Sequence, residues 1–179
     1  MTDYSNLFDM SGRTALVVGA GSGIGQASAE GLAAFGAHVI CADIDLEHAN
    51  VTVSGIMRDG GSAIPCQLDM TDENAVQTLL EEIGAVDVLI TTPSINVRKP
   101  MLEISGEEFD RVIGLNLKGT FTLMQAAGRG MAAQGRGSII AFSSIRSQVP
   151  TPSWLMDRSK SALTSSNVTS IGSSLRWRK

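Results

Sequence analysis

The chain of 179 residues has few cysteines, no long apolar run and little net charge, and each of these shortages excludes a class of protein. Its two cysteines, Cys41 and Cys66, are too few for a disulfide framework; both fall in expected buried strands, so we expect reduced thiols. No apolar run reaches the roughly 18 residues that a membrane-spanning helix needs. A net charge of −4 gives no basis for nucleic acid or an anionic membrane as a partner. The first five residues are polar and do not resemble a secretion signal, so we expect a cytoplasmic protein. We also expect no metal site.

What the chain does have is a globular composition, with 43 % hydrophobic and 18 % charged residues, and enough length for one sizeable core. Short apolar segments alternate with amphipathic ones. The predicted strands are residues 14–18, 38–42, 63–68, 86–91 and 138–142, and the predicted helices are 23–35, 45–58, 71–83 and a long one that begins at a capping box, residues 105–108. Strands that are apolar throughout are typical of a parallel sheet covered on both faces. The sequence therefore predicts an α/β fold, a Rossmann-like, doubly wound parallel sheet with ligands at the carboxyl ends of the strands.

The spacing of apolar residues in the predicted helices indicates which side of each helix faces the sheet. These residues are Ile24, Ala27, Leu32 and Phe35 in the first helix, Ala75, Val76, Leu79, Leu80 and Ile83 in the third, and Phe109, Val112, Ile113, Leu117, Phe121 and Met124 in the long one.

The segment Gly19–Gly25 (GAGSGIG) lies between the first predicted strand and the first predicted helix. Glycines at 19, 23 and 25 allow a tight turn and a close approach of the backbone to a pyrophosphate. The helix that follows offers unpaired N–H groups and a partial positive charge to that anion. We therefore predict a dinucleotide site that includes Gly19, Ser22, Gly23, Ile24 and Gly25.

Several polar residues stand at matching distances from this loop. They are Asp43 after the second strand, Asp69 after the third, Asn116 in the long helix, Ser143 and Ser144 after the fifth strand, and Lys160 beyond it. Together with the G-x-x-x-G-x-G spacing, they resemble the short-chain dehydrogenase/reductase family over about residues 7–142, and only patchily after that. Residues 95–100 and 112–121 are similar to 3-oxoacyl-carrier-protein reductases of that family, a likeness that says little about the substrate. The resemblance implies hydride transfer between a nicotinamide dinucleotide and an alcohol or ketone.

Asp43 ends the second predicted strand, 24 residues after Gly19. A carboxylate there can accept both hydroxyls of an adenosine ribose and would repel a 2′-phosphate. Because no arginine or lysine stands near it in sequence, we expect NAD, with NADP less favoured. Alternatively, Asp43 caps the helix that begins near Asp45.

The resemblance implies that Asp69 and Met70 flank the adenine ring, Asp69 through its side chain and Met70 through its backbone. Alternatively, Asp69 caps the helix that begins near Thr71.

Three further residues are candidates for the chemistry. Asn116 lies in an otherwise apolar helical face, where an amide needs partners; it is either a satisfied core amide or, as the resemblance implies, a residue that distorts the helix and holds a water in a proton relay. A hydroxyl at Ser144, or less favourably at Ser143, stands where a substrate carbonyl oxygen would gain charge, although serines are common at strand ends. Lys160 resembles the lysine that holds the nicotinamide ribose, or else it is a solvated surface lysine.

Two departures from the family pattern stand out. The family's Asn-Asn-Ala-Gly after strand four is here Thr91–Ser94 (TTPS), which we interpret as a variant. The family's catalytic tyrosine stands four residues before the lysine, and Met156 occupies that position. A thioether has no proton to give, and the chain's single tyrosine is Tyr4, so we expect at best residual turnover.

The composition changes near residue 150. Between residues 150 and 179, 11 of 30 residues are Ser or Thr, and five basic residues stand against one acidic residue. We therefore predict a dinucleotide-binding domain over 1–149 and a divergent tail over 150–179, with the fold truncated after about strand five. A frameshift or premature stop is one hypothesis for this tail; a neighbouring reading frame should then encode a tyrosine four residues before a lysine.

Two functions of different classes follow. The first is an NAD-dependent oxidoreductase acting on an alcohol or ketone, impaired by the missing tyrosine. The second is a non-catalytic dinucleotide-binding protein or a defective remnant. The resemblance also implies a possible homodimer through the long helix.

Overall fold

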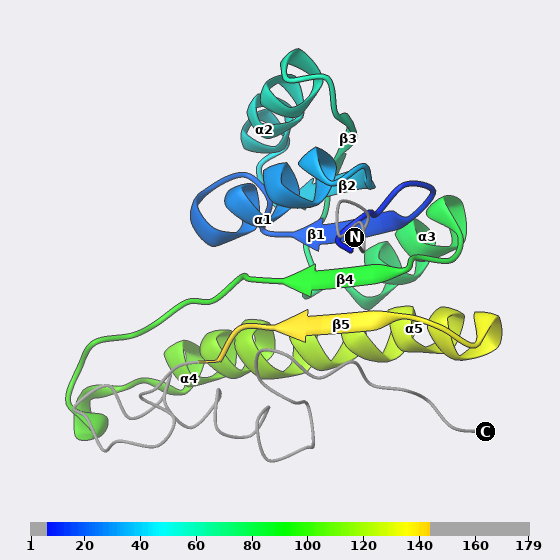
Figure 1. Ribbon diagram of the computed structural model, residues 1–179. Coiled ribbons are helices and arrows are strands. Elements are labelled where there is room, and N and C mark those ends of the chain that lie inside the picture. The colour runs from blue at the N-terminus through cyan, green and yellow to red at the C-terminus, as the bar shows by residue number, and fades with distance from the viewer. Residues whose placement is uncertain (1–6, 144–179) are drawn as a thin grey trace.

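The computed structural model describes residues 7–143. Five parallel strands form one sheet in the order β3-β2-β1-β4-β5. The strands are β1 (Thr14–Val18), β2 (His38–Asp43), β3 (Ser62–Gln67), β4 (Val88–Thr91) and β5 (Ser138–Ala141), as Figure 1 shows. The parallel, doubly wound α/β fold expected from the alternating pattern is confirmed.

The helices are α1 (Gly23–Ala34), α2 (Leu46–Arg58), α3 (Glu73–Ile83), α4 (Gly106–Ile113) and α5 (Thr120–Gln134), with a 3₁₀ turn, η1 (Met101–Glu103), before α4. α1 and α2 pack on one face of the sheet, and α3 and α5 pack on the other. Each face of the sheet therefore has its own apolar core, which explains why the strands are apolar throughout.

The first helix turns a face to the sheet that shares only Leu32 with the face its apolar spacing predicts. Its buried residues are Gly25, Ala29 and Ala33, whereas Ile24 and Phe35 are 58 % and 54 % exposed. Small residues four apart let the helix approach the sheet closely, and this requirement outweighs hydrophobicity. The expected stripe of α3 is confirmed, with Val76 and Leu79 buried.

The long helix is interrupted by one segment of π-helix, η2 (Gly114–Gly119), between α4 and α5. Its predicted start is confirmed: the Ser105 hydroxyl accepts the Glu108 N–H, and the Glu108 carboxylate accepts the Ser105 N–H. Phe121, which follows the π-helical segment, is 56 % exposed, against expectation. Phe109, which lies before the π-helical segment, is also partly exposed.

The two cysteines lie in neighbouring strands and are not bonded to each other. Cys41 in β2 is buried, and burial, with a smaller effect from Glu30, raises the pKa of its thiol to about 11. Cys66 in β3 is only partly buried, although we expected both to be buried.

Candidate functional site

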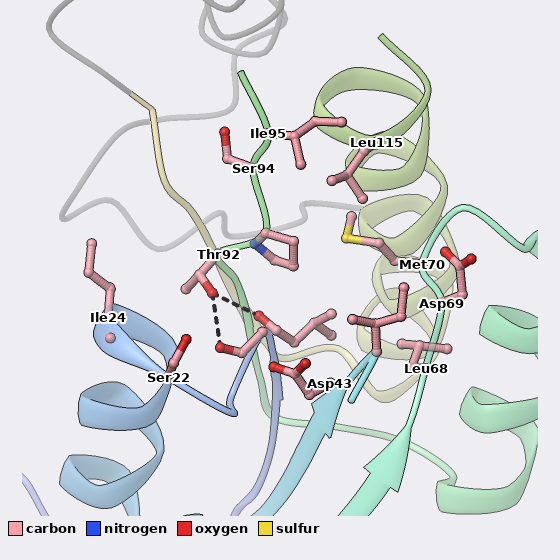
Figure 2. Close-up of a pocket in the computed structure, with 15 residues that line it drawn as sticks. Ser22, Ile24, Asp43, Leu68, Asp69, Met70, Thr92, Ser94, Ile95 and Leu115 are labelled. Atoms are coloured by element: carbon pink, nitrogen blue, oxygen red, sulfur yellow. Dashed lines mark hydrogen bonds between the residues drawn. The ribbon is translucent and has the colours of Figure 1, made fainter. Parts of the chain in front are cut away.

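A cleft of about 490 Å³ opens at the carboxyl ends of the strands. Its lining comprises Gly19, Ser22, Gly23 and Ile24 from the glycine loop and α1, Asp43 and Ile44 after β2, Leu68, Asp69 and Met70 after β3, Thr92, Pro93, Ser94 and Ile95 after β4, and Val18 and Leu115. In Figure 2, Ser22 and Ile24 lie across from Asp69 and Met70, with Asp43 between them. All of the predicted dinucleotide-binding residues before residue 144 line this cleft except Gly25.

The glycine loop, residues 19–25, needs glycine for steric reasons. A Cβ on Gly25 would collide with the Gly19 carbonyl, so α1 could not start where it does. Gly19 has a φ of 82°, and a Cβ there would collide with the Thr92 hydroxyl. A Cβ on Gly21 would lie 2.6 Å from the Cβ of His48 and 2.8 Å from a carboxylate oxygen of Asp43. The spacing argument singled out positions 19, 23 and 25 and missed Gly21, because its tight contacts come from β2 and α2.

The start of α1 differs from the starts of the helices α2, α3 and α4. Those helices are capped by the side chains of Asp45, Asp72 and Ser105. Within residues 7–143, Ser22 makes no capping hydrogen bond at the start of α1, although serine is a favoured capping residue. The first-turn N–H groups of α1 thus keep their capacity to bind an anion in the cleft.

The carboxylate of Asp43 is tied to the backbone on both sides. One oxygen accepts the N–H of Gly21 at 2.8 Å, and the other accepts the N–H of Asp45 at 3.1 Å. The side chain that caps α2 is that of Asp45, so the helix-cap alternative for Asp43 is wrong. Each carboxylate oxygen can accept more than one hydrogen bond, so Asp43 can still bind hydroxyl groups of a ligand.

Asp69 also lines the cleft, and its carboxylate accepts hydrogen bonds from a residue close in sequence. One of its carboxylate oxygens accepts both the N–H and the hydroxyl of Thr71, at 2.9 and 2.7 Å. The expected helix start near Thr71, with Asp69 as its cap, is wrong, because α3 begins at Glu73 and Asp72 caps it. Met70 is 3 % exposed and lines the cleft beside Asp69.

Asn116 lies inside the π-helical segment and is fully buried. Its amide oxygen accepts the N–H of Ile95 at 2.9 Å, and its amide nitrogen donates to the carbonyl of Ile95 at 2.8 Å. These contacts are those of the satisfied core amide that we gave as one alternative. They attach the loop after β4 to the long helix, and that loop forms one wall of the cleft.

Thr92 replaces an amide of the family pattern and ties β4 to the glycine loop. Its hydroxyl lies 3.1 Å from the carbonyl of Val18 and 3.4 Å from that of Gly19, the two dashed lines in Figure 2. Pro93 follows directly and packs against Gly19. These contacts support interpreting Thr91–Ser94 as a structural variant.

The remaining predicted site residues, Ser144, Met156 and Lys160, lie outside the described residues, as do the predicted tail and Tyr4. Ser143 is described and is exposed just beyond β5. Within residues 7–143 no group of His, Cys, Asp and Glu side chains has a geometry that could hold a metal ion. In the same part of the chain, no helix combines the length and hydropathy needed to cross a membrane.

Comparison with known proteins gives one family. The family model for short chain dehydrogenases matches residues 13–165. Sorbitol dehydrogenase of Cereibacter sphaeroides is 39 % identical over 135 residues, covering 73 % of this chain and 52 % of the relative. Gluconate 5-dehydrogenase of Gluconobacter oxydans is 34 % identical over 153 residues, covering 83 % of this chain and 60 % of the relative.

A solved structure agrees. Gluconate 5-dehydrogenase from Burkholderia cenocepacia, crystallised with NADP and tartrate, superimposes with a TM-score of 0.81 at 30 % identity, covering 87 % of this chain and 63 % of that one. The chain thus spans between half and two thirds of the length of these relatives. Fold, cleft and sequence agree that the chain belongs to the short-chain dehydrogenase family of oxidoreductases.

Proposed function

We propose that this chain binds NAD or NADH in the cleft at the carboxyl ends of the strands, with the diphosphate at the start of α1. The observation that carries the proposal is the start of α1: among residues 7–143 no side chain caps it, and Gly19, Gly21 and Gly25 let the loop pass close beside it. A bound nicotinamide dinucleotide would accept or supply a hydride.

NAD rather than NADP is the dinucleotide that Asp43 favours. Its carboxylate lines the cleft, held by two backbone N–H groups, and a 2′-phosphate beside it would meet like charge. The relative from Burkholderia cenocepacia was crystallised with NADP, so this preference would distinguish the two proteins.

The reaction we propose is oxidation of a secondary alcohol or reduction of a ketone. Relatives include dehydrogenases named for sorbitol and gluconate, so polyols and sugar acids are the first substrates to test. A 3-oxoacyl reductase is also among the similar structures, at 29 % identity, and 3-oxoacyl thioesters are the second class. Ser144 would polarise the carbonyl oxygen, and Lys160 would hold the ribose.

Turnover should be slow, because Met156 stands where the family's tyrosine donates a proton. General acid catalysis is worth roughly 10²–10⁴-fold, which is the loss we expect. Protons would have to come from solvent by way of Lys160. The second candidate function, a dinucleotide-binding protein without catalysis, is favoured by the same missing acid.

One pair of measurements tests these proposals. NADH and NADPH are titrated into the protein by fluorescence, and alcohol oxidation is then assayed with NAD. We expect tighter binding of NADH than of NADPH, and weak turnover that Met156→Tyr raises. Binding without turnover in both proteins would leave the non-catalytic function, and failure to bind either nucleotide at millimolar concentration would contradict the proposal.

A homodimer through the long helix is a further proposal. Phe109 and Phe121 on that helix are 40 % and 56 % exposed, and a second copy of the chain on that helix would cover them. Sedimentation of the wild type against Phe121→Ser tests it: the variant should shift towards the monomer, and two identical profiles would contradict it.

A further inference from the structure

α2 carries a buried hydroxyl that reaches the glycine loop. The buried residues of α2 are Ala49, Thr52, Val53 and Ile56, and Thr52 is 1 % exposed. The Thr52 hydroxyl donates to the carbonyl of Ala20 at 2.8 Å, and the carbonyl of His48 in its own helix is 3.4 Å away. Valine has nearly the same shape and would avoid the cost of burying a hydroxyl. The hydroxyl therefore matters for the loop that it contacts.

The Ala20 carbonyl and the Gly21 N–H belong to one peptide group, and side chains hold both of its polar atoms. Thr52 from α2 holds the oxygen, and Asp43 from the end of β2 holds the N–H. Because a peptide group is planar, fixing both polar atoms fixes its orientation. The preceding N–H groups, of Gly19 and Ala20, both donate to the carbonyl of Ala42 at 2.8 and 3.1 Å. The Ala20–Gly21 peptide is thus the last point where the loop is tied before the uncapped start of α1.

This peptide in turn orients Asp43. The carboxylate oxygen that accepts the Gly21 N–H belongs to the side chain that faces the cleft. Without the Thr52 hydroxyl, the buried carbonyl of Ala20 would lack this donor, and the peptide would gain by rotating towards water. Such a rotation would carry the Gly21 N–H away from Asp43 and release the carboxylate on that side.

We propose that Thr52 is a positioning residue for nucleotide discrimination: by holding the Ala20–Gly21 peptide, it keeps Asp43 oriented to accept the ribose hydroxyls of NAD and to exclude the 2′-phosphate of NADP. This inference rests on the proposed nucleotide binding. The inference goes beyond nucleotide binding because it assigns part of the discrimination between NAD and NADP to Thr52, a residue of α2 that does not line the cleft.

The test uses the full chain and compares wild type, Thr52→Val, Thr52→Ser and Ile56→Val, a control on the same buried face of α2. Dissociation constants for NADH and NADPH are measured by fluorescence titration. We expect Thr52→Val to weaken NADH binding about fivefold, the effect of one lost hydrogen bond, and NADPH binding much less. The ratio of the two constants should therefore fall in Thr52→Val, recover in Thr52→Ser and stay unchanged in Ile56→Val.

The outcomes separate the inference from the function on which it rests. A wild type that binds neither nucleotide contradicts the proposed function, and this inference falls with it. A wild type that prefers NADH, with the same ratio in Thr52→Val, overturns the inference alone. If Thr52→Val does not fold, Thr52→Cys replaces it, because a thiol is a poor donor of nearly the same size as serine. An equal ratio in Thr52→Cys and Thr52→Ser would then overturn the inference.

Discussion

The glycines of the loop have different steric roles, and their spacing in the sequence predicts only some of these roles. Gly25 allows α1 to start against the Gly19 carbonyl, and Gly21 lets the loop pass between Asp43 and His48. Spacing identifies Gly25, because its contact lies six residues away in the same motif. The contacts of Gly21 come from residues more than twenty positions along the chain, and no local pattern carries that information.

The matched pair Gly25→Ala and Gly31→Ala tests the steric argument within one helix. A Cβ at Gly25 meets backbone, whereas nothing lies within 4 Å of a Cβ at Gly31. We expect Gly25→Ala to lower the free energy of unfolding by about 1–3 kcal/mol through overpacking and to weaken NADH binding at least tenfold. Gly31→Ala should raise the free energy of unfolding by roughly 0.5–1 kcal/mol through helix propensity and leave NADH binding unchanged. Urea unfolding and fluorescence titration measure both, and wild-type NADH affinity in Gly25→Ala would contradict the argument.

At the scale of elements, the sequence predicts where helices lie better than which way they face. α1 buries Gly25, Ala29 and Ala33 and exposes Ile24 and Phe35, because close packing on the sheet selects small residues. The π-helical segment around Asn116 is equally invisible to a period of 3.6 residues. It forms where a buried amide bonds to the backbone of Ile95, a partner 21 residues earlier. The facing of α1 is therefore a wrong prediction, whereas the resemblance implied the distortion at Asn116; both features arise where tertiary contacts outweigh the local pattern.

We therefore expect Asn116 to attach the loop after β4 to the long helix. Asn116→Leu removes the two side-chain hydrogen bonds to Ile95 and leaves the N–H and carbonyl of Ile95 without these partners. We expect a loss of about 2–4 kcal/mol in unfolding free energy and faster hydrogen exchange at the Ile95 amide. Asn50→Leu is the control, because Asn50 is an exposed residue of α2 whose amide donates to the carbonyl of Leu46 in its own helix. Unchanged exchange at Ile95 would show that the amide does not hold the loop.

At the scale of the whole molecule, one end of the sheet forms the cleft and the other end holds a cluster of charged residues. The carboxyl ends of the strands form the cleft, and the amino ends meet at Asp87, just before β4. The Asp87 carboxylate accepts the Thr14 N–H, Arg13 at 3.0 Å and Arg136 at 2.8 Å, so it joins the starts of β1, β4 and β5. Alternating apolar segments predicted the fold class, but this cluster brings together residues 49 and 74 positions apart in sequence.

The pH dependence of folding should report this cluster. Burial by itself would raise the pKa of Asp87, but the Thr14 N–H and the arginines Arg136 and Arg13 outweigh burial and hold it below its ordinary value. A carboxyl group with a lowered pKa in the folded state stabilises the protein above its unfolded pKa, about 3.9, and loses that contribution as the pH falls through the folded pKa. Asp87→Ala should therefore lower the unfolding free energy by about 1–2 kcal/mol at pH 7, since the Thr14 N–H loses its partner while the partly exposed side chains of Arg13 and Arg136 can turn to water.

Below pH 4 the gap between wild type and Asp87→Ala should shrink, because protonation removes the same charge in the wild type. Urea unfolding from pH 7 to pH 2 measures the gap, with Asp59→Ala as the control: the Asp59 side chain is 76 % exposed and pairs with its equally exposed neighbour Arg58. That control should remain within about 0.5 kcal/mol of the wild type throughout. A gap that stays constant down to pH 2 would mean that the Asp87 side chain stabilises the sheet by packing, and that its charge contributes little.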